Sequence, residues 1–190
     1  MVANLIAVEM DKPSEAAPMY QQETAVVMPQ EVRPVEALVE TIVETYPVPL
    51  DKELQFFIAQ ECERVNIAPE VVFAMIQKES SFRADAVGDN GQSFGLLQIQ
   101  PRWHAERMDR LGVDDLLDPY QNIKVGVDYL AELVNRYEDI DMALMAYNAG
   151  SAGANKHWWS KGVYSNSYST EVMETSEAIT KGMVVDVLYG

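Results

Sequence analysis

Glu79 is the residue whose type and position most clearly suggest chemistry. Val72, Ile76 and Glu79 recur at the i, i+4, i+7 spacing of one helix face, so Glu79 continues an apolar stripe. A carboxyl group placed there loses hydration and lies near the negative end of the helix dipole, and both effects raise its pKa. A carboxylic acid that stays protonated near neutral pH is what a general acid requires. The alternative is an ordinary last-turn residue at the solvent edge, paired with Lys78 or Arg83.

Four ordered blocks of residues accompany this acid between positions 79 and 172. They are Glu79-Ser80, Gly95-Leu96-Leu97-Gln98, Ala146-Tyr147-Asn148-Ala149-Gly150, and Tyr168 followed by Val172. Together they resemble the motifs of the bacterial soluble lytic transglycosylases, which are lysozyme-like enzymes that cleave the glycan strands of peptidoglycan. The segment from Asp118-Pro119 to Leu130 also resembles the long helix of that family.

The resemblance implies a specific reaction for Glu79. This residue would protonate the glycosidic oxygen of the β-1,4 bond between N-acetylmuramic acid and N-acetylglucosamine. It would then act as base on the C6 hydroxyl of the muramoyl sugar, which closes a 1,6-anhydro ring instead of admitting water. In this family the N-acetyl oxygen of the substrate is thought to stabilise the charge at C1, so one carboxyl group suffices where ordinary glycosidases need two.

The resemblance also assigns substrate-binding roles to seven further residues: Ser80, Gly95, Leu97, Gln98, Tyr147, Asn148 and Tyr168. A glycine lets the backbone approach a sugar closely, and a glutamine offers both a donor and an acceptor to its polar groups. The two tyrosines are expected to flank Glu79, and Ser80 to fix its rotamer. Leu97 stands where the family has methionine, a swap that conserves volume and is expected to keep the groove lining. Two alternatives stay open: Tyr147 as a core residue, and Asn148 as a helix cap.

Two other functions remain open beside the transglycosylase interpretation. Asp85 and Asp89 follow Glu79 in the next loop, and either could be the second carboxylate of a hydrolytic muramidase. The run Asp89-Asn90-Gly91 is also a simple turn sequence. A third interpretation is a peptidoglycan-binding module that kept the fold and lost the activity.

The remaining chemically interesting side chains carry weaker signals. His104 and His157 lack any partner pattern, so catalysis by either is not predicted. Tryptophan rings can stack on sugars, although Trp103 is equally well explained as a core anchor of its helix. Cys62 lies on an apolar helix face and is expected to be an inert buried thiol. Trp158 and Trp159 are the other two tryptophans whose rings could stack on a sugar.

Composition excludes several classes of function. The 190 residues include 30 acidic and 14 basic side chains, for a formal net charge of −16. Such an acidic chain is unsuited to bind nucleic acid or an anionic membrane surface. One cysteine and two histidines exclude an intramolecular disulfide and a structural zinc site, so neither a metal nor a cofactor is predicted. No apolar stretch approaches the roughly 18 residues that a membrane span needs.

The chain changes character near residue 50. Residues 1–49 hold six of the nine prolines and none of the ten glycines, which predicts a disordered acidic leader. Residues 50–180 predict a mainly α, lysozyme-like domain of the goose type, with at most a small β-hairpin after Ser81, and residues 181–190 predict a tail. Local signals mark helix starts at Asp51, Pro69, Pro101 and Asp118-Pro119, and helix ends at Gly112 and Gly150.

The predicted partner is the glycan strand of peptidoglycan, bound by a monomer that acts at the bacterial cell wall, outside the cell. The first ten residues carry an apolar patch without a basic segment, so no secretory signal is predicted and the export route stays open. Wall remodelling, a phage, a secretion apparatus and a conjugation apparatus would all employ such a domain.

Overall fold

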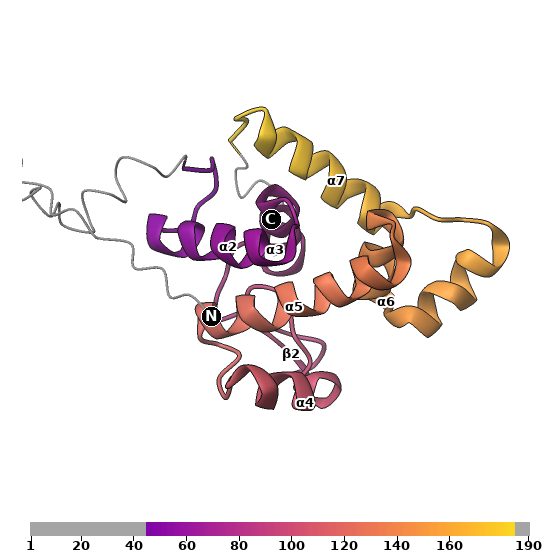
Figure 1. Cartoon of the computed structure of the whole chain (residues 1–190), viewed down its shortest axis with the longest axis horizontal. Coiled ribbons are helices and arrows are strands. Elements are labelled where there is room, and N and C mark those ends of the chain that lie inside the picture. Colours follow the sequence, from indigo (N-terminus) through magenta and orange to yellow (C-terminus); the bar gives the residue numbers. More distant parts are fainter. Residues whose placement is uncertain (1–44, 185–190) are drawn as a thin grey trace, which may run out of the picture. The chain divides into compact units, whose positions relative to one another are not determined.

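The computed structural model describes residues 45–184, and within this range the chain is mainly helical (Figure 1). A single hairpin interrupts the helices, as the sequence predicted. The elements are α2 (Lys52–Val65), α3 (Pro69–Ser80), β1 (Val87–Gly88), β2 (Ser93–Phe94), α4 (Pro101–Leu111), α5 (Pro119–Tyr137), α6 (Ile140–His157), the 3₁₀ helix η1 (Trp159–Lys161) and α7 (Ser167–Thr180). None of the helices in the described range is both long and apolar enough to cross a membrane.

Local signals in the sequence set the helix boundaries. The Asp51 side chain accepts a hydrogen bond of 2.7 Å from the backbone N–H of Leu54, and Asp118 accepts one of 2.9 Å from that of Gln121. These caps satisfy donors that the first turn of a helix leaves unpaired. Pro69 occupies the first turn of α3, where the missing N–H of proline costs nothing. The helix starts predicted at these positions are therefore confirmed.

The hairpin pairs Val87 with Phe94 and Gly88 with Ser93 in antiparallel register. Its turn passes through Asp89 and Asn90, whose φ angles are 50° and 56°. Aspartate and asparagine tolerate this left-handed conformation better than most residues, which explains why this sequence turns here. The turn places Asp89 at one end of the hairpin, a position that matters for the site described below.

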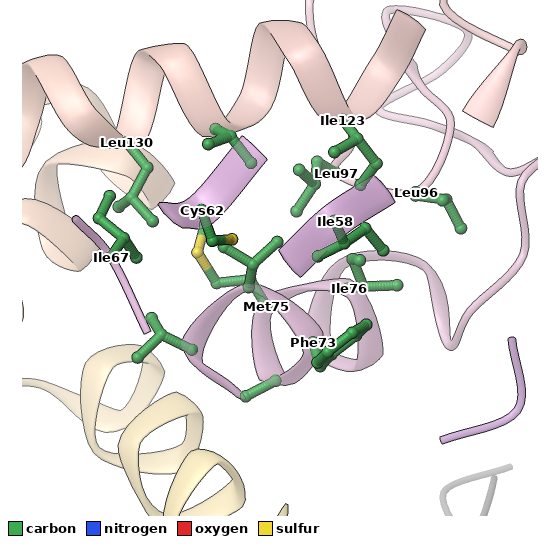
Figure 2. Close-up of a cluster of buried hydrophobic side chains, with 14 of the residues drawn as sticks. Ile58, Cys62, Ile67, Phe73, Met75, Ile76, Leu96, Leu97, Ile123 and Leu130 are labelled. Atoms are coloured by element: carbon green, nitrogen blue, oxygen red, sulfur yellow. The ribbon is translucent and has the colours of Figure 1, made fainter. Parts of the chain in front are cut away.

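Helix α3 forms the centre of the core, and six consecutive residues from Val71 to Ile76 are buried. It packs against α2 and α7, while α5 packs against α2 and α6. Figure 2 shows side chains of α2, α3, α5 and the segment after β2 meeting in one cluster. Burial raises the pKa of Cys62 in this cluster to about 12, so its thiol stays protonated at neutral pH.

The core extends to residues that the sequence assigned to the leader. Tyr46 packs against Phe73 with ring centroids 4.6 Å apart, and Val48 also packs on the core. The amide of Gln55 fixes this segment, because its Oε1 accepts from Tyr46 N at 2.8 Å and its Nε2 donates to Leu50 O at 2.8 Å. The rest of the predicted leader, residues 1–44, and residues 185–190 of the predicted tail lie outside the described residues.

Helix α6 breaks at Gly150, where φ is 68° and ψ is 153°. A residue with a Cβ atom adopts this conformation only with strain, so glycine is required at this point. The predicted stop at Gly150 is thus confirmed for the first part of the helix. The chain then resumes a helical path to His157, which the sequence did not predict.

Candidate active site

Glu79 lies in the last turn of α3 and lines a cleft of about 830 Å³. The cleft walls come from the hairpin, from the segment between β2 and α4, and from one side each of α4, α5 and α6. The other lining residues are Gly88, Asp89, Ser93, Gln98, Ile99, Gln100, Trp103, His104, Arg107, Tyr129, Glu132, Tyr147, Asn148, Ala149 and Gly150.

The environment of Glu79 keeps its carboxyl group near half protonation at neutral pH. Burial is the largest cause and raises the pKa of Glu79 to about 7. The hydrogen bond from Tyr168 opposes this rise, the charge of Asp89 adds to it, and the charge of Lys78 opposes it. A carboxyl group with a pKa near the working pH can both donate and accept a proton, which is the property of a general acid/base.

Tyr168 holds the Glu79 carboxyl group in place. Its phenol donates a hydrogen bond of 2.5 Å to Glu79 Oε1 across 89 residues of sequence. Burial and the neighbouring Glu79 raise the pKa of Tyr168 well above its ordinary value, so the phenol keeps the proton that it donates. The capping box of Asn166 and Ser169 fixes the first turn of α7, which carries Tyr168.

Tyr147 lies in the same cleft but its hydroxyl has another partner. The phenol donates to the backbone carbonyl of Leu97 at 3.0 Å, and its ring contacts Tyr129 with centroids 5.1 Å apart. Burial first, and then the charge of Glu79, raise the pKa of Tyr147 well above its ordinary value. The residue therefore faces Glu79 while it ties α6 to the Gly95–Gln98 segment.

The Gly95–Gln98 segment is shaped by α5. Gly95 has a φ of 73°, and a Cβ atom there would lie 2.3 Å from Leu116 O and from Asn122 Nδ2. The fully buried Asn122 donates to Phe94 O at 2.8 Å and to Leu116 O at 2.9 Å, and accepts from Leu97 N at 2.8 Å. The structure thus gives a packing reason for the glycine, in addition to the close approach of a sugar that the sequence suggested.

Replacing Asn122 by alanine is expected to lower the free energy of unfolding by about 2–4 kcal/mol, because it leaves the backbone N–H of Leu97 and the carbonyl of Leu116 without their hydrogen-bond partner. The Phe94 carbonyl keeps its bond from Ile99 N. Urea denaturation followed by circular dichroism measures this change. Asn135→Ala is the matched control, since Asn135 is exposed on the same helix. Equal stability of the two variants would contradict a clamping role for Asn122.

The other residues of the predicted site divide between the cleft and the interior. Gln98 lines the cleft, and its amide nitrogen donates to Gly95 O at 2.9 Å and Ala86 O at 3.2 Å. Asn148 is exposed and lines the cleft as well. Leu97 and Ser80 are buried and are not among the lining residues, and the Ser80 hydroxyl donates to Ile76 O at 3.0 Å.

The two candidate second carboxylates differ in position. Asp89 lines the cleft, where its Oδ2 accepts from Ser93 Oγ at 2.6 Å and from Gln100 Nε2 at 2.8 Å. Asp85 is exposed and is not among the lining residues. Only Asp89 therefore shares the cleft with Glu79.

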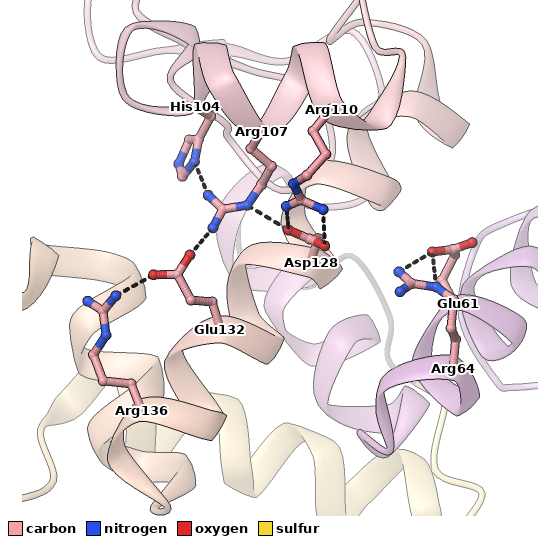
Figure 3. Close-up of polar contacts among 8 residues, drawn as sticks. All are labelled: Glu61, Arg64, His104, Arg107, Arg110, Asp128, Glu132 and Arg136. Atoms are coloured by element: carbon pink, nitrogen blue, oxygen red, sulfur yellow. Dashed lines mark hydrogen bonds and ion pairs between the residues drawn. The ribbon is translucent and has the colours of Figure 1, made fainter.

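One wall of the cleft contains residues to which the sequence gave no firm role. Trp103, His104 and Arg107 of α4 line it together with Tyr129 and Glu132 of α5. Figure 3 shows Arg107 between the two helices, next to His104 and Glu132. The spacing i, i+1, i+4 along α4 places these side chains near one another, but the sequence does not reveal the contacts of His104 and Arg107 with α5.

Comparisons with known proteins identify the family of this chain. A family model described as transglycosylase SLT domain matches residues 56–170. The transglycosylase of Enterobacteria phage PRD1 is 36% identical over 109 residues, which cover 57% of this chain and 37% of that protein. Invasion protein IagB of Salmonella typhimurium is 32% identical over 93 residues, which cover 46% of this chain and 58% of that protein.

A solved structure agrees with the fold. It is an inactive mutant of the lytic transglycosylase Slt from Pseudomonas aeruginosa, with a TM-score of 0.55 and 21% identity over 66% of this chain and 24% of that one. The fold is that of the lysozyme-like class. Within that class, the chain belongs to the transglycosylase SLT domain family. It spans between 37% and 58% of the length of the two curated relatives given above.

Proposed function

We propose that this chain is a lytic transglycosylase that cleaves the β-1,4 bond between N-acetylmuramic acid and N-acetylglucosamine in peptidoglycan. The observation that carries this proposal is the carboxyl group of Glu79, which lines the cleft with a pKa of about 7. Membership of the family and the names of the relatives support it. Among them is a membrane-bound lytic murein transglycosylase of Desulfosudis oleivorans, 37% identical over 100 residues that cover 49% of this chain and 21% of that protein.

In the proposed reaction, Glu79 serves first as acid and then as base. Its proton goes to the glycosidic oxygen, the bond from C1 to that oxygen breaks, and the N-acetylglucosamine side leaves with a new hydroxyl group. The Glu79 carboxylate next takes the proton of the muramoyl C6 hydroxyl as the C6 oxygen bonds to C1. The carboxyl group is reprotonated, and no water is consumed. Tyr168 engages Oε1, and within residues 45–184 no hydrogen bond engages Oε2, which is the oxygen left for this proton transfer.

A second candidate function is hydrolysis, and the position of Asp89 in the same cleft favours it. In that reaction Asp89 would assist a water molecule at C1 while Glu79 protonates the leaving oxygen. The two bonds of 2.6 and 2.8 Å that Asp89 accepts from Ser93 and Gln100 fit equally well with a structural role at the hairpin turn.

Product analysis separates these reactions. Purified peptidoglycan digested by the protein is expected to yield anhydromuramoyl ends, which mass spectrometry identifies because they are one water lighter than reducing ends. Exclusive formation of reducing ends would rule out the transglycosylase proposal and support hydrolysis.

Asp89→Asn provides an independent test on the enzyme. In a transglycosylase, its turnover at pH 6 is expected to stay within a few-fold of wild type, because Glu79 alone handles the proton. A loss of more than about 100-fold would instead be expected from removal of a general base. Asp85→Asn is the matched control, because Asp85 follows the same helix but does not line the cleft.

We further propose that the chain acts at the bacterial cell wall, with peptidoglycan glycan strands as its partner. The relatives in phage PRD1 and Salmonella, the latter named an invasion protein, support a role in local opening of the wall by a phage or secretion apparatus. Digestion of isolated cell walls, compared with isolated glycan strands, tests whether intact wall is a substrate.

A further inference from the structure

Trp103 is exposed to a degree that a core role does not explain. The indole is 71% exposed, and it lies in the first turn of α4 at the cleft. The Arg102 guanidinium lies over the ring, 4.9 Å from its centroid, which helps to hold the ring in one orientation. A flat aromatic face presented in a cleft is suited to stack on the C–H face of a sugar ring, since aromatic side chains supply large contact area at low entropic cost.

His104, the next residue, offers a hydrogen-bond donor whose position is fixed. Its ring is only 8% exposed and meets Tyr129 edge-on at 4.6 Å. The Nδ1 atom lies 2.6 Å from Arg107 Nη1. A guanidinium can only donate, so Nδ1 must accept and the ring proton must reside on Nε2.

Two acids on α5 hold Arg107 in the orientation that sets this tautomer (Figure 3). Asp128 Oδ2 accepts from Arg107 Nε at 2.8 Å, and Glu132 accepts from its Nη2. Arg110 and Arg136 pair with the same two acids and restrain them in turn. Burial and the charge of Arg107 also lower the pKa of His104 to about 4, so the ring is neutral at neutral pH.

The Nε2–H group of His104 has no hydrogen-bond partner within the part of the chain that the structure describes. Because Nδ1 is turned toward Arg107, Nε2 is the polar atom through which this cleft-lining ring can meet a ligand. A neutral N–H donor suits a carbonyl oxygen, and the acetamido group carried by both sugars of peptidoglycan supplies one.

We propose that Trp103 and His104 form a saccharide subsite on the α4 wall of the cleft. The indole face stacks on an N-acetylhexosamine ring, and His104 Nε2–H donates to the acetamido carbonyl oxygen of that sugar. Arg107 is a positioning residue that orients the imidazole. The identity of the sugar rests on the proposed function, whereas the stacking and donor geometry do not.

Calorimetric titration of a Glu79→Gln protein tests the subsite without cleavage. The probe is a peptide-free glycan oligomer of alternating N-acetylglucosamine and N-acetylmuramic acid. Trp103→Ala and His104→Phe are each expected to weaken its binding about tenfold. Trp103→Phe retains a stacking face and His104→Gln retains an N–H donor, so both should bind more tightly than the first two variants. Tyr164→Ala and His157→Phe are matched controls, because these residues are exposed and do not line the cleft.

In the protein with Glu79 intact, Trp103→Ala and His104→Phe are expected to raise KM about tenfold with a much smaller change in kcat, as for lost uniform binding. If Trp103→Ala and His104→Phe, each made in the Glu79→Gln protein, bind the glycan as tightly as Glu79→Gln alone, the subsite proposal alone is overturned. Reducing-end products together with weakened binding would overturn the proposed reaction alone, and absence of any glycan binding would overturn both. If His104→Phe fails to fold by circular dichroism, the exposed Trp103 pair decides the outcome.

Discussion

Glu79→Gln is expected to abolish glycan cleavage, with a loss of turnover of at least about 1,000-fold. General acid/base catalysis contributes roughly 10²–10⁴-fold for one proton transfer. Glu79 performs two proton transfers in the proposed reaction. Glutamine has the same shape and can still accept the Tyr168 hydrogen bond on its carbonyl oxygen. Release of muropeptides from purified peptidoglycan, followed by chromatography, measures the effect. Glu106→Gln is the matched control, since Glu106 is exposed on α4 and does not line the cleft.

The same variant is expected to be more stable than wild type at alkaline pH. The folded-state pKa of Glu79 is raised from 4.5 to about 7, so the folded protein binds the proton more tightly than the unfolded chain does. The stability contributed by that proton is fully present below pH 4.5 and is lost as the pH rises through 7. Glutamine does not titrate, so Glu79→Gln does not lose this stability at alkaline pH. The difference in free energy of unfolding between Glu79→Gln and wild type should therefore grow by up to about 3 kcal/mol, in favour of the variant, between pH 4 and pH 8.

Thermal denaturation at several pH values checks this stability difference. The melting temperature of Glu79→Gln should exceed that of wild type increasingly as the pH rises from 5 to 8. An active Glu79→Gln protein would remove Glu79 as the acid in both the transglycosylase and the hydrolase. Full glycan binding without cleavage by the wild-type protein would instead favour the inactive binding module.

The sequence predicts the elements of this fold because most of its boundaries are set locally. Asp51, Pro69 and the Asp118-Pro119 pair act within one helical turn, and the structure has all of them in their predicted places. The apolar stripe that ends at Glu79 likewise predicts that its carboxyl group is desolvated. The packing of Tyr46 on the core was missed because it depends on Gln55 and on the face of Phe73, contacts that prolines in the sequence obscured.

The details of the site depend on contacts between distant segments, which one sequence does not reveal. The size of the pKa shift of Glu79 depends on Tyr168 of α7 and on Asp89 of the hairpin turn. His104 seemed to lack a partner because Arg107 becomes its partner only when Asp128 and Glu132 of α5 orient the guanidinium. Ser80 matched a motif, yet its hydroxyl bonds within its own helix.

Tyr168→Phe is expected to lower kcat about 10- to 100-fold, because a misoriented acid loses much of the advantage of a fixed geometry. The variant is also expected to change the pH dependence of the rate, in a direction that a merely structural role of Tyr168 would not produce. The Tyr168 hydrogen bond lowers the pKa of Glu79, so its removal is expected to raise that pKa from its value of about 7. Since Glu79 must be protonated to act as acid, the falling limb of the rate at alkaline pH should move to higher pH.

Asp89→Asn supplies the opposite shift in the same experiment. The charge of Asp89 raises the pKa of Glu79, so its removal should move the alkaline limb to lower pH. Rates measured from pH 4 to 9 on one peptidoglycan preparation give the alkaline limb of each variant. Tyr164→Phe is the control, because the Tyr164 phenol does not line the cleft. If Glu79 is the group that titrates, Tyr168→Phe and Asp89→Asn must move the alkaline limb in opposite directions, because Tyr168 lowers the pKa of Glu79 and Asp89 raises it. Limbs that do not move would mean that another group controls the pH dependence, and the acid role of Glu79 would then have to be abandoned.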